Sequence, residues 1–538
     1  MTNENSTYLV GLSKADMTAF IKGVGMMGYG QFHNIVQEVA TPLMARAAWI
    51  DKDGHPFVWV HLEQAFVTIA LKEELLKRLR ASHPDWPLSE RHVLVTAQHT
   101  HAAPGRYSHH PLYNFTIKDL QTRVFEKVAS SMVEAIEGAH QNRAAARLSW
   151  GEVIIADKER VAFNRSMAPY LKNPEAKNIA LEEKHLAVDR RMVGLKIESL
   201  TGSLVGFINW FGVHGTSISS YNQRIHHDNK GVAADLFEKA HPGCVAMFVQ
   251  CSAGDVSPNF RWDKKVKRMV GEYDDQYESA AYNGQIQFRE AEKIEATQSV
   301  RGGLHTHQSY FDMGSPAHGL GFFRGTLEGP GVAPVVGDLL GMIGKMVNMA
   351  HLVRHPEDRP FYDLHGKKNI LLDHRRGTLL GLSVRAFYKM PRMPDPTVES
   401  IRATAVKGAM NTLPWVPQVI PLQVIQLGNL LLLTIPGEIT TVAAVRLKAA
   451  CVKAVAALGI DEVLITTYAN GYMGYVTTPE EYDIQAYEGG HTVYGRNTLG
   501  LLIHCFETLW AQLRAGTERE SLTPPFHFPP DELARRSV

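Results

Sequence analysis

Short apolar runs with the character of β-strands alternate along this chain with longer runs of helical periodicity. Apolar residues recur at helical spacing over 118–139, 440–459 and 497–516. Alternation of this kind is typical of α/β proteins and argues against an all-α or all-β fold. The strand-like runs are HVLVTAQ (92–98), LVGFINWFGV (204–213), CVAMFVQC (244–251) and EVLITTYA (462–469).

The most apolar stretch of the chain, VIQLGNLLLLTI (424–435), is interrupted by Gly428-Asn429 and indicates two strands joined by a tight turn. No apolar run reaches the roughly 20 residues that a membrane-spanning helix needs. The N-terminus, MTNENSTYLVGLSKADMT, lacks the basic and apolar segments of a signal peptide. We therefore expect no transmembrane segment and a cytoplasmic location; a secreted or periplasmic one would require that the N-terminus had been trimmed.

Composition narrows the class of protein further. With 538 residues, 45% of them hydrophobic, the chain can bury a large core. Its net charge of +1 and the lack of a basic block give no reason to expect a nucleic-acid partner. Four scattered cysteines without a C-x-x-C pair indicate buried thiols in a reduced protein: Cys244, Cys251, Cys451 and Cys505. The oligomeric state is left open.

Histidines follow two of the predicted strands. QHTHAAPG (98–105) contains His99 and His101, which would point to the same side of an extended chain, and VHGTS (213–217) contains His214. A histidine that closes an apolar strand is more often a core residue than a ligand, and an isolated H-x-H is weak. Each of these motifs alone therefore favours a structural interpretation.

Three further polar clusters follow strands. Ser257 lies in FVQCSAGDVSPN (248–259), where turn chemistry explains every residue, and Glu438 in IPGE (435–438) precedes a predicted helix, whose dipole favours a carboxylate. A tyrosine-rich loop occupies 470–490. Strand ends in α/β sheets converge on one edge, where ligands usually bind. Two imidazoles and a carboxylate gathered there would suit zinc with one open position.

Several enzyme classes lack their motifs in this chain. No G-x-S-x-G nucleophile elbow is present, no Walker loop occurs, and no G-x-G-x-x-G follows a strand. The Gly-, Pro- and His-rich stretch from 301 to 400 contains SPAHGLGFFRGTLEGPG (315–331), which we expect to be a long ordered loop that lines a site.

A set of longer motifs shows a resemblance to a known family. The chain resembles the neutral (neutral/alkaline, non-lysosomal) ceramidases, which hydrolyse the amide bond of N-acylsphingosine, from about Tyr8 to about Leu513. The motifs, in the family's order, are VGMMGYGQF (24–32), QHTHAAPG (98–105), FNRS (163–166), NWFGVHGTS (209–217), DNKG (228–231), AGDVSPN (253–259), PGEITT (436–441) and YVTTPEEYDIQAYEGGHTVYG (475–495).

The resemblance implies a metal site. His99, His214, Glu438 and Tyr475 match the family's zinc ligands, so one Zn²⁺ per chain is expected. It also implies the fold of the family's catalytic domain, a large α/β domain of mixed sheets flanked by helices.

The resemblance implies catalytic residues as well. Ser257 matches the serine assigned as nucleophile, His101 a second histidine beside the zinc, and Arg165 an arginine that contacts substrate. Tyr487 is expected in the same pocket wall. His101 or zinc-bound hydroxide would take the serine proton, and Arg165, Tyr475 and the metal would stabilise the oxyanion. In the rival mechanism zinc-bound water attacks directly and Ser257 only positions it.

The chain departs from the family in two places. We expect a catalytic domain over 1–516 and a proline-rich tail over 517–538, without the immunoglobulin-like C-terminal domain of other members. The Ser257 motif continues as FRWDKKVKRMVGEYDD, which differs from the usual continuation.

Two alternatives to a ceramidase remain open at this stage. The same zinc-serine amidase could act on a non-sphingolipid N-acyl amine or a small amide, or the fold could serve as a silent lipid-binding protein. For the enzyme, the expected partners are an N-acyl lipid or a small-molecule amide and transient contact with a membrane surface.

Overall fold

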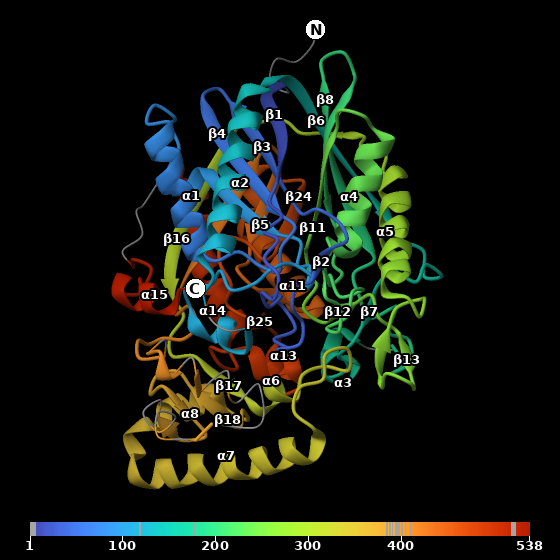
Figure 1. Ribbon diagram of the computed structural model, residues 1–538. Coiled ribbons are helices and arrows are strands. Elements are labelled where there is room, and N and C mark those ends of the chain that lie inside the picture. Colours follow the sequence, from blue (N-terminus) through green and yellow to red (C-terminus); the bar gives the residue numbers. More distant parts are fainter. Residues whose placement is uncertain are drawn as a thin grey trace.

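The computed structural model describes residues 7–117, 120–176, 178–383, 410–517 and 523–537, together with scattered residues between 386 and 408 (Figure 1). Two large sheets and the helices that cover them make up most of the fold. None of the helices in these ranges combines the length and the apolar character needed to cross a bilayer.

The larger sheet has nine strands and is mostly antiparallel, with parallel pairs at its two edges. Its apolar residues alternate between faces, as in β3, where Trp49 and Ala48 join different core clusters. The strand order is β11 (Val245–Val249), β9 (Leu204–Trp210), β8 (Arg191–Ser199), β6 (Ala144–Ile154), β1 (Thr7–Asp16), β3 (Met44–Lys52), β4 (His55–Leu62) and β5 (Val93–Ala97), with β15 (Gln298–Ser299) on β6.

The second sheet has four strands and packs face to face on the first. Leu430 and Leu432 of one strand share a cluster with Trp59, whereas Leu431 and Leu433 point to the other side. The order is β16 (Leu304–Asp312), β21 (Val419–Leu427), β22 (Leu430–Thr434) and β24 (Glu462–Thr466). The predicted hairpin over 424–435 is therefore confirmed as β21 and β22.

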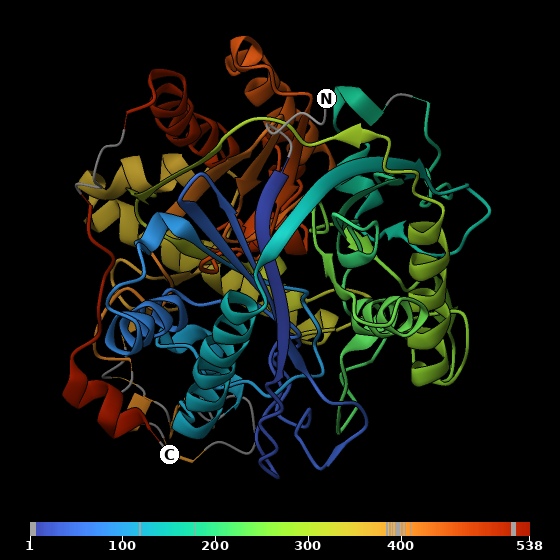
Figure 2. The same ribbon diagram turned by 90° about the horizontal axis from the view of Figure 1, so that it is seen from above.

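Helices cover the two outer faces, so the molecule has four layers. The first sheet is covered by α1 (Ile69–Ser82), α2 (Thr122–Gln141), α4 (Asp228–Ala240) and α5 (Gln276–Glu292). The second sheet is covered by α11 (Thr441–Ala454) and α14 (Thr498–Ala515). Figure 2 shows α1 and α2 on one side of the blue strands and the orange α11 and the red α14 on the opposite side. The α/β fold class is confirmed.

The segment that follows β16 differs from the prediction. Residues 315–331 are not only a loop, because they include β17 (Ala317–Gly319) and the short helix α6 (Leu320–Arg324). The long helix α7 (Pro334–Arg354) and the helix α8 (Arg359–His365) follow, and β17 joins a small sheet with β18 (Ile370–Asp373), β19 (Thr378–Leu379) and β20 (Leu382–Ser383). The C-terminal stretch ends in α15 (Pro530–Arg536), next to the buried ring of Phe528.

The expectation that strand ends meet at one edge is wrong for the larger sheet. Five antiparallel pairings separate β4 from β9, so β4 and β5 run opposite to β9 and β11. The residues beyond β5 and β9 meet instead through a bridge between Thr100 and Gly215. The Gln250 side chain reinforces this meeting by donating to Gln98 O (2.9 Å). The polar clusters thus converge through close contact of the segments that follow the strands.

A close approach of α2 to β1 gives a test of the first layer. A Cβ on Gly11 would lie 1.9 Å from the carbonyl oxygen of Ala139, which is backbone and cannot move aside freely. We expect Gly11→Ala to lower the free energy of unfolding by about 1–3 kcal/mol, measured by urea denaturation. Gly500→Ala in α14 is the control, since its Cβ would meet no described atom within 4 Å; it should stabilise by up to about 1 kcal/mol. Equal changes in the free energy of unfolding for the two variants would contradict the close approach of Gly11 to Ala139.

Lys230 of α4 joins the segment that follows β9 to the end of β11. Its buried Nζ donates to Phe211 O at 2.7 Å and Val249 O at 3.4 Å, and burial lowers the pKa of Lys230 to about 7. Unfolded lysine keeps its proton to about pH 10.4. Above pH 7 the unfolded state therefore binds more protons, and this group makes stability rise with pH.

We therefore expect Lys230→Met to lose about 1–3 kcal/mol by leaving buried carbonyls unpaired. The loss should grow from about pH 7 to about pH 9, in unfolding free energies measured across that range. Lys239→Met, at an exposed position of the same helix, is the control. A loss that does not change with pH would show that Lys230 keeps its charge when folded.

Candidate functional site

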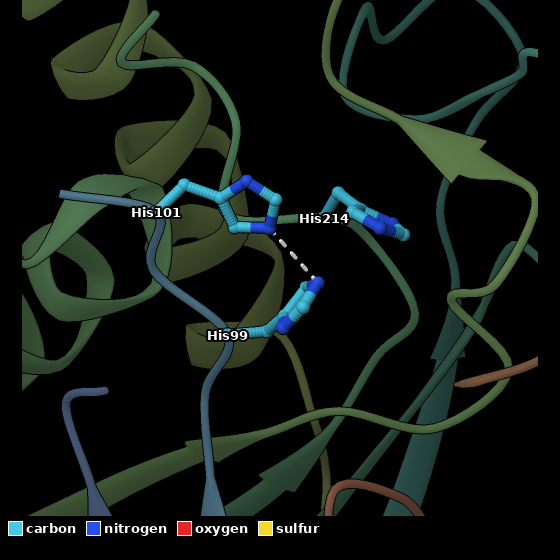
Figure 3. Close-up of side chains that lie close together, drawn as sticks. All are labelled: His99, His101 and His214. Carbon is cyan, nitrogen blue, oxygen red and sulfur yellow. Dashed lines mark hydrogen bonds between the residues drawn. The ribbon is translucent and has the colours of Figure 1, made fainter. Parts of the chain in front are cut away.

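Three buried histidines lie together where the segments after β5 and β9 meet. His99 and His101 come from the first segment and His214 from the second (Figure 3). The Nε2 atoms of His99 and His101 are 3.0 Å apart, and one nitrogen from each of the three rings falls within 4.8 Å of the others. The backbone at His99 is not extended as expected but left-handed, with φ of 73°, and this turn brings its ring toward His101.

Backbone carbonyls orient two of the rings. His99 Nδ1 donates to Ala65 O at 2.6 Å, and His214 Nδ1 donates to Ala253 O at 2.7 Å. A ring that donates through Nδ1 in its neutral form carries a lone pair on Nε2, which is the form that binds metals. Burial lowers the pKa of His99 to about 4, so its ring is neutral at pH 7 in this arrangement.

Glu438 and Tyr475 complete the cluster from two paired strands. They are direct partners in the parallel pairing of β23 (Glu438–Ile439) with β25 (Tyr475–Val476). Glu438 Oε2 lies 3.0 Å from His214 Nε2 and 3.5 Å from His99 Nε2. The Tyr475 hydroxyl is 3.5 Å from His214 Nε2. The structure therefore brings all four sequence-predicted ligands together.

Two tyrosines hold the carboxylate in place. The hydroxyls of Tyr468 and Tyr472 donate to Glu438 at 3.1 and 2.5 Å. Burial would raise the pKa of Glu438, but its interactions with His99 and His214 and the hydrogen bond from Tyr472 outweigh burial and keep that pKa well below its usual value. Glu438 is therefore an anion in a buried site.

These groups suit a metal cation. The Nε2 lone pairs and a carboxylate oxygen are all acceptors, and acceptors that face one another in a buried space require a cation or shared protons. Two imidazoles, a carboxylate and a phenol oxygen form a donor set that fits zinc. A second acidic group around Glu63 and Asp235 is different, because the guanidinium of Arg46 already binds both carboxylates.

Arg165 forms the side of the site beside Tyr475. Its Nη2 donates to the Tyr475 hydroxyl and to Gly254 O, both at 2.9 Å, and its Nε donates to Glu488 at 3.0 Å. Burial and the charge of Glu438 raise the pKa of Tyr475 well above its usual value, so the phenol keeps its proton. The half-buried ring of Tyr487 lies 5.4 Å from that of Tyr475, in the same wall.

Ser257 is fully buried beside this cluster. It lies in β12 (Val256–Ser257), which pairs with β7 (Phe163–Asn164), and its Oγ accepts the backbone N–H of Asn259 at 2.9 Å. The preceding carbonyl, Val256 O, accepts the N–H of His214. Within the described ranges no hydrogen bond joins Ser257 to a site histidine, so the two are linked through the backbone.

Sequence patterns missed two buried carboxylates of the site. Glu328 bonds Thr216 Oγ1 at 3.0 Å and Asn259 Nδ2 at 2.8 Å, and so ties the His214 segment to the Ser257 segment. Glu488 holds Arg165. Glu328 lies in 315–331, which the sequence singled out as lining a site, and Glu488 lies in the tyrosine-rich loop. Only the region, and not the residue, could be predicted.

Comparisons with known proteins identify the family of this chain. The family model "Neutral/alkaline non-lysosomal ceramidase, N-terminal" matches residues 8–374 and 397–504. The chain is 31% identical to a neutral ceramidase of Pseudomonas aeruginosa over 521 residues, which cover 94% of this chain and 72% of that protein. A neutral ceramidase of Mycobacterium tuberculosis is 30% identical over 543 residues, covering 94% and 77% of the two chains.

Solved structures give the same result. The chain is similar to a structure described as ceramidase complexed with C2, with a TM-score of 0.79 at 29% identity, over 97% of this chain and 77% of that one. A crystal structure of neutral ceramidase from Pseudomonas aeruginosa matches with a TM-score of 0.77. The predicted enzyme class, a hydrolase acting on linear amide bonds, is confirmed with the family. The chain belongs to the neutral/alkaline non-lysosomal ceramidase family.

Proposed function

We propose that this protein is a zinc-dependent amidohydrolase that cleaves the N-acyl amide bond of ceramide to sphingosine and a free fatty acid. The observation that carries the proposal is the buried convergence of His99, His214 and Glu438 beside Tyr475 and Ser257. Membership of the family supports an N-acyl lipid as the substrate.

His99, His214, Glu438 and Tyr475 would hold one zinc ion. When bound, zinc supplies a Lewis acid that polarises the amide carbonyl and stabilises negative charge. The chain keeps the ligands in the form this requires. Two backbone carbonyls fix the histidine tautomers, and two tyrosine hydroxyls orient the carboxylate.

Ser257 would attack the amide carbon. The Asn259 N–H occupies an acceptor position on Oγ, so the hydroxyl proton is directed to another partner. His101 would take it on its buried Nδ1, which has no hydrogen-bond partner among the described residues. The same ring would return the proton to the departing amine. Water would then attack the acyl ester on Ser257, with His101 again taking a proton, which releases the fatty acid and restores the serine hydroxyl.

Arg165 and Tyr475 would stabilise the oxyanion that forms on the carbonyl oxygen. Both are donors, and their mutual hydrogen bond together with Glu488 fixes their positions before the substrate binds. Preorganised donors of this kind contribute about 3–4 kcal/mol each to transition-state stabilisation.

Removal of the metal tests whether the activity depends on zinc. We expect hydrolysis of a fluorescent ceramide that is lost on chelation and restored by Zn²⁺. His214→Ala should lower bound zinc, measured by elemental analysis, because it removes one of the four ligands and the ring that lies 3.0 Å from Glu438. His241→Ala, at a partly exposed histidine directly after α4, is the control and should keep the metal. If the protein hydrolyses short N-acyl amines but not ceramide, it is a zinc amidase with another substrate and not a ceramidase.

Substitution of Ser257 separates the two mechanisms. Ser257→Ala should lower kcat about 10³-fold or more, because the nucleophile is removed, with bound zinc unchanged. Ser252→Ala, a second buried serine of the same segment, should keep most of the activity. Trapping of an acyl-enzyme by rapid quench would support covalent attack. Residual turnover within tenfold of the wild type would show that water attacks directly and that Ser257 only positions it.

A further inference from the structure

The helix α7 exposes an apolar stripe along its whole length. Its outward residues recur at intervals of three or four positions, which places them on one face of a helix. Their exposed fractions run from 51% at Leu339 to 84% at Val353. The stripe consists of Val335, Leu339, Met342, Met346, Met349 and Val353.

The inward face of α7 lies opposite this stripe and is made of small residues. Gly337, Gly341 and Gly344 are buried, and a Cβ on Gly344 would lie 2.4 Å from Leu371. A surface helix normally turns its apolar face toward the core. The outward stripe therefore indicates a binding surface for a partner outside the described part of the chain.

A basic hairpin lies at the same end of the molecule. The strands β13 (Arg261–Asp263) and β14 (Arg268–Val270) enclose a turn with three exposed lysines, Lys264, Lys265 and Lys267. Trp262 and Val266 are 48% and 47% exposed beside them. Figure 1 shows α7 across the lower end of the molecule and the hairpin at its lower right. From the sequence these residues did not form a basic block, but the turn gathers them.

Both features are tied to the catalytic cluster. The hairpin begins four positions after Ser257, and Met269 N donates to Leu327 O at 2.9 Å. Leu327 is 59% exposed, whereas its neighbour Glu328 is buried against Thr216 and Asn259. The segment from Gly325 to Ala333 then leads directly into α7. One continuous rim thus connects the apolar stripe, the basic turn and the site.

The dimensions of the stripe argue against a second copy of the chain as the partner. From Val335 to Val353 it is about 27 Å long and about 10 Å wide, or about 300 Å². A stable protein–protein interface needs about 800 Å² from each partner. A lipid bilayer sets no such minimum, and it combines an apolar interior with, on anionic membranes, a negative surface that attracts lysines. Exposed tryptophan suits the same boundary.

We propose that α7 and the β13–β14 hairpin form a docking face for anionic lipid bilayers, with the stripe inserted among the acyl chains and the lysines on the headgroups. The proposal rests on the proposed function, because a ceramide substrate is itself a bilayer component. The docked rim would place the segment around Leu327, which borders the site through Glu328, against the membrane that carries the substrate.

Sedimentation of the full-length protein with vesicles tests this proposal. The vesicles are phosphatidylcholine alone or phosphatidylcholine mixed with phosphatidylserine. K264A/K265A/K267A should weaken binding to the anionic vesicles about 100-fold, since each lysine near the surface contributes about a fivefold factor, and should change binding to the neutral ones little. M342Q/M346Q/M349Q should weaken binding to both by about tenfold or more.

Two control variants match these changes elsewhere on the surface. K158A/K239A/K453A removes three exposed lysines away from the rim, and V445Q/V452Q replaces exposed apolar residues of α11. Both should bind vesicles as the wild type does. Hydrolysis of a soluble short-chain ceramide should be unchanged in all four variants, which shows that they fold and that their sites are intact.

The outcomes separate the docking face from the catalytic assignment. Wild-type protein that cleaves the soluble ceramide but binds neither vesicle would overturn the docking proposal alone. If the rim variants lose vesicle binding as expected but the wild type cleaves neither soluble nor bilayer-embedded ceramide, the proposed function is overturned and the docking face is supported. If M342Q/M346Q/M349Q instead converts a dimer to a monomer in sedimentation velocity, the stripe is an interface between copies and the proposal fails.

Discussion

The structure depends on a group of hydrogen-bond acceptors that the fold holds close together. The Nε2 lone pairs of His99 and His214 and the carboxylate of Glu438 face one another in a buried space, and backbone carbonyls and tyrosine hydroxyls fix them in that orientation. Such a cluster is unfavourable by itself, so the rest of the fold must hold it in place. The four layers do so: His99 and His214 follow strands of the first sheet, Glu438 and Tyr475 follow strands of the second, and the site lies where these segments meet.

Contacts outside the regular elements hold the two sheets in register at this point. The Gln250 side chain bridges Gln98 and Val213, and Thr467, beyond β24, donates to Gln250 O. A single amide residue thereby connects three strand ends. Lys230 adds a second connection beneath it. These side chains supply hydrogen bonds to backbone carbonyls that are buried. Without them each of those carbonyls would remain unpaired.

This arrangement explains which parts were predictable from the sequence. The strand and helix runs, the hairpin around Gly428-Asn429 and the α/β class depend on local periodicity, and they were predicted. The gathering of His99, His214, Glu438 and Tyr475 was predicted through resemblance, since nothing in their spacing specifies that β23 and β25 pair. Glu328, Glu488 and the outward stripe of α7 were missed, because long-range contacts and the orientation of a helix leave no mark on a local pattern. Location in the cell stays a prediction.

The segment between α6 and α7 connects the exposed rim to the catalytic groups. Within three residues the chain passes from an exposed apolar side chain, Leu327, through a buried carboxylate, Glu328, to Gly329, where an added Cβ would lie 3.1 Å from the ring of Tyr29. Tyr29 in turn packs edge-on against His101 at 4.6 Å. A displacement of this segment would therefore be felt by the proposed proton acceptor and by the Asn259 that orients Ser257. If the rim docks on a bilayer, substrate delivery and alignment of the catalytic groups would be coupled through the same short stretch of chain.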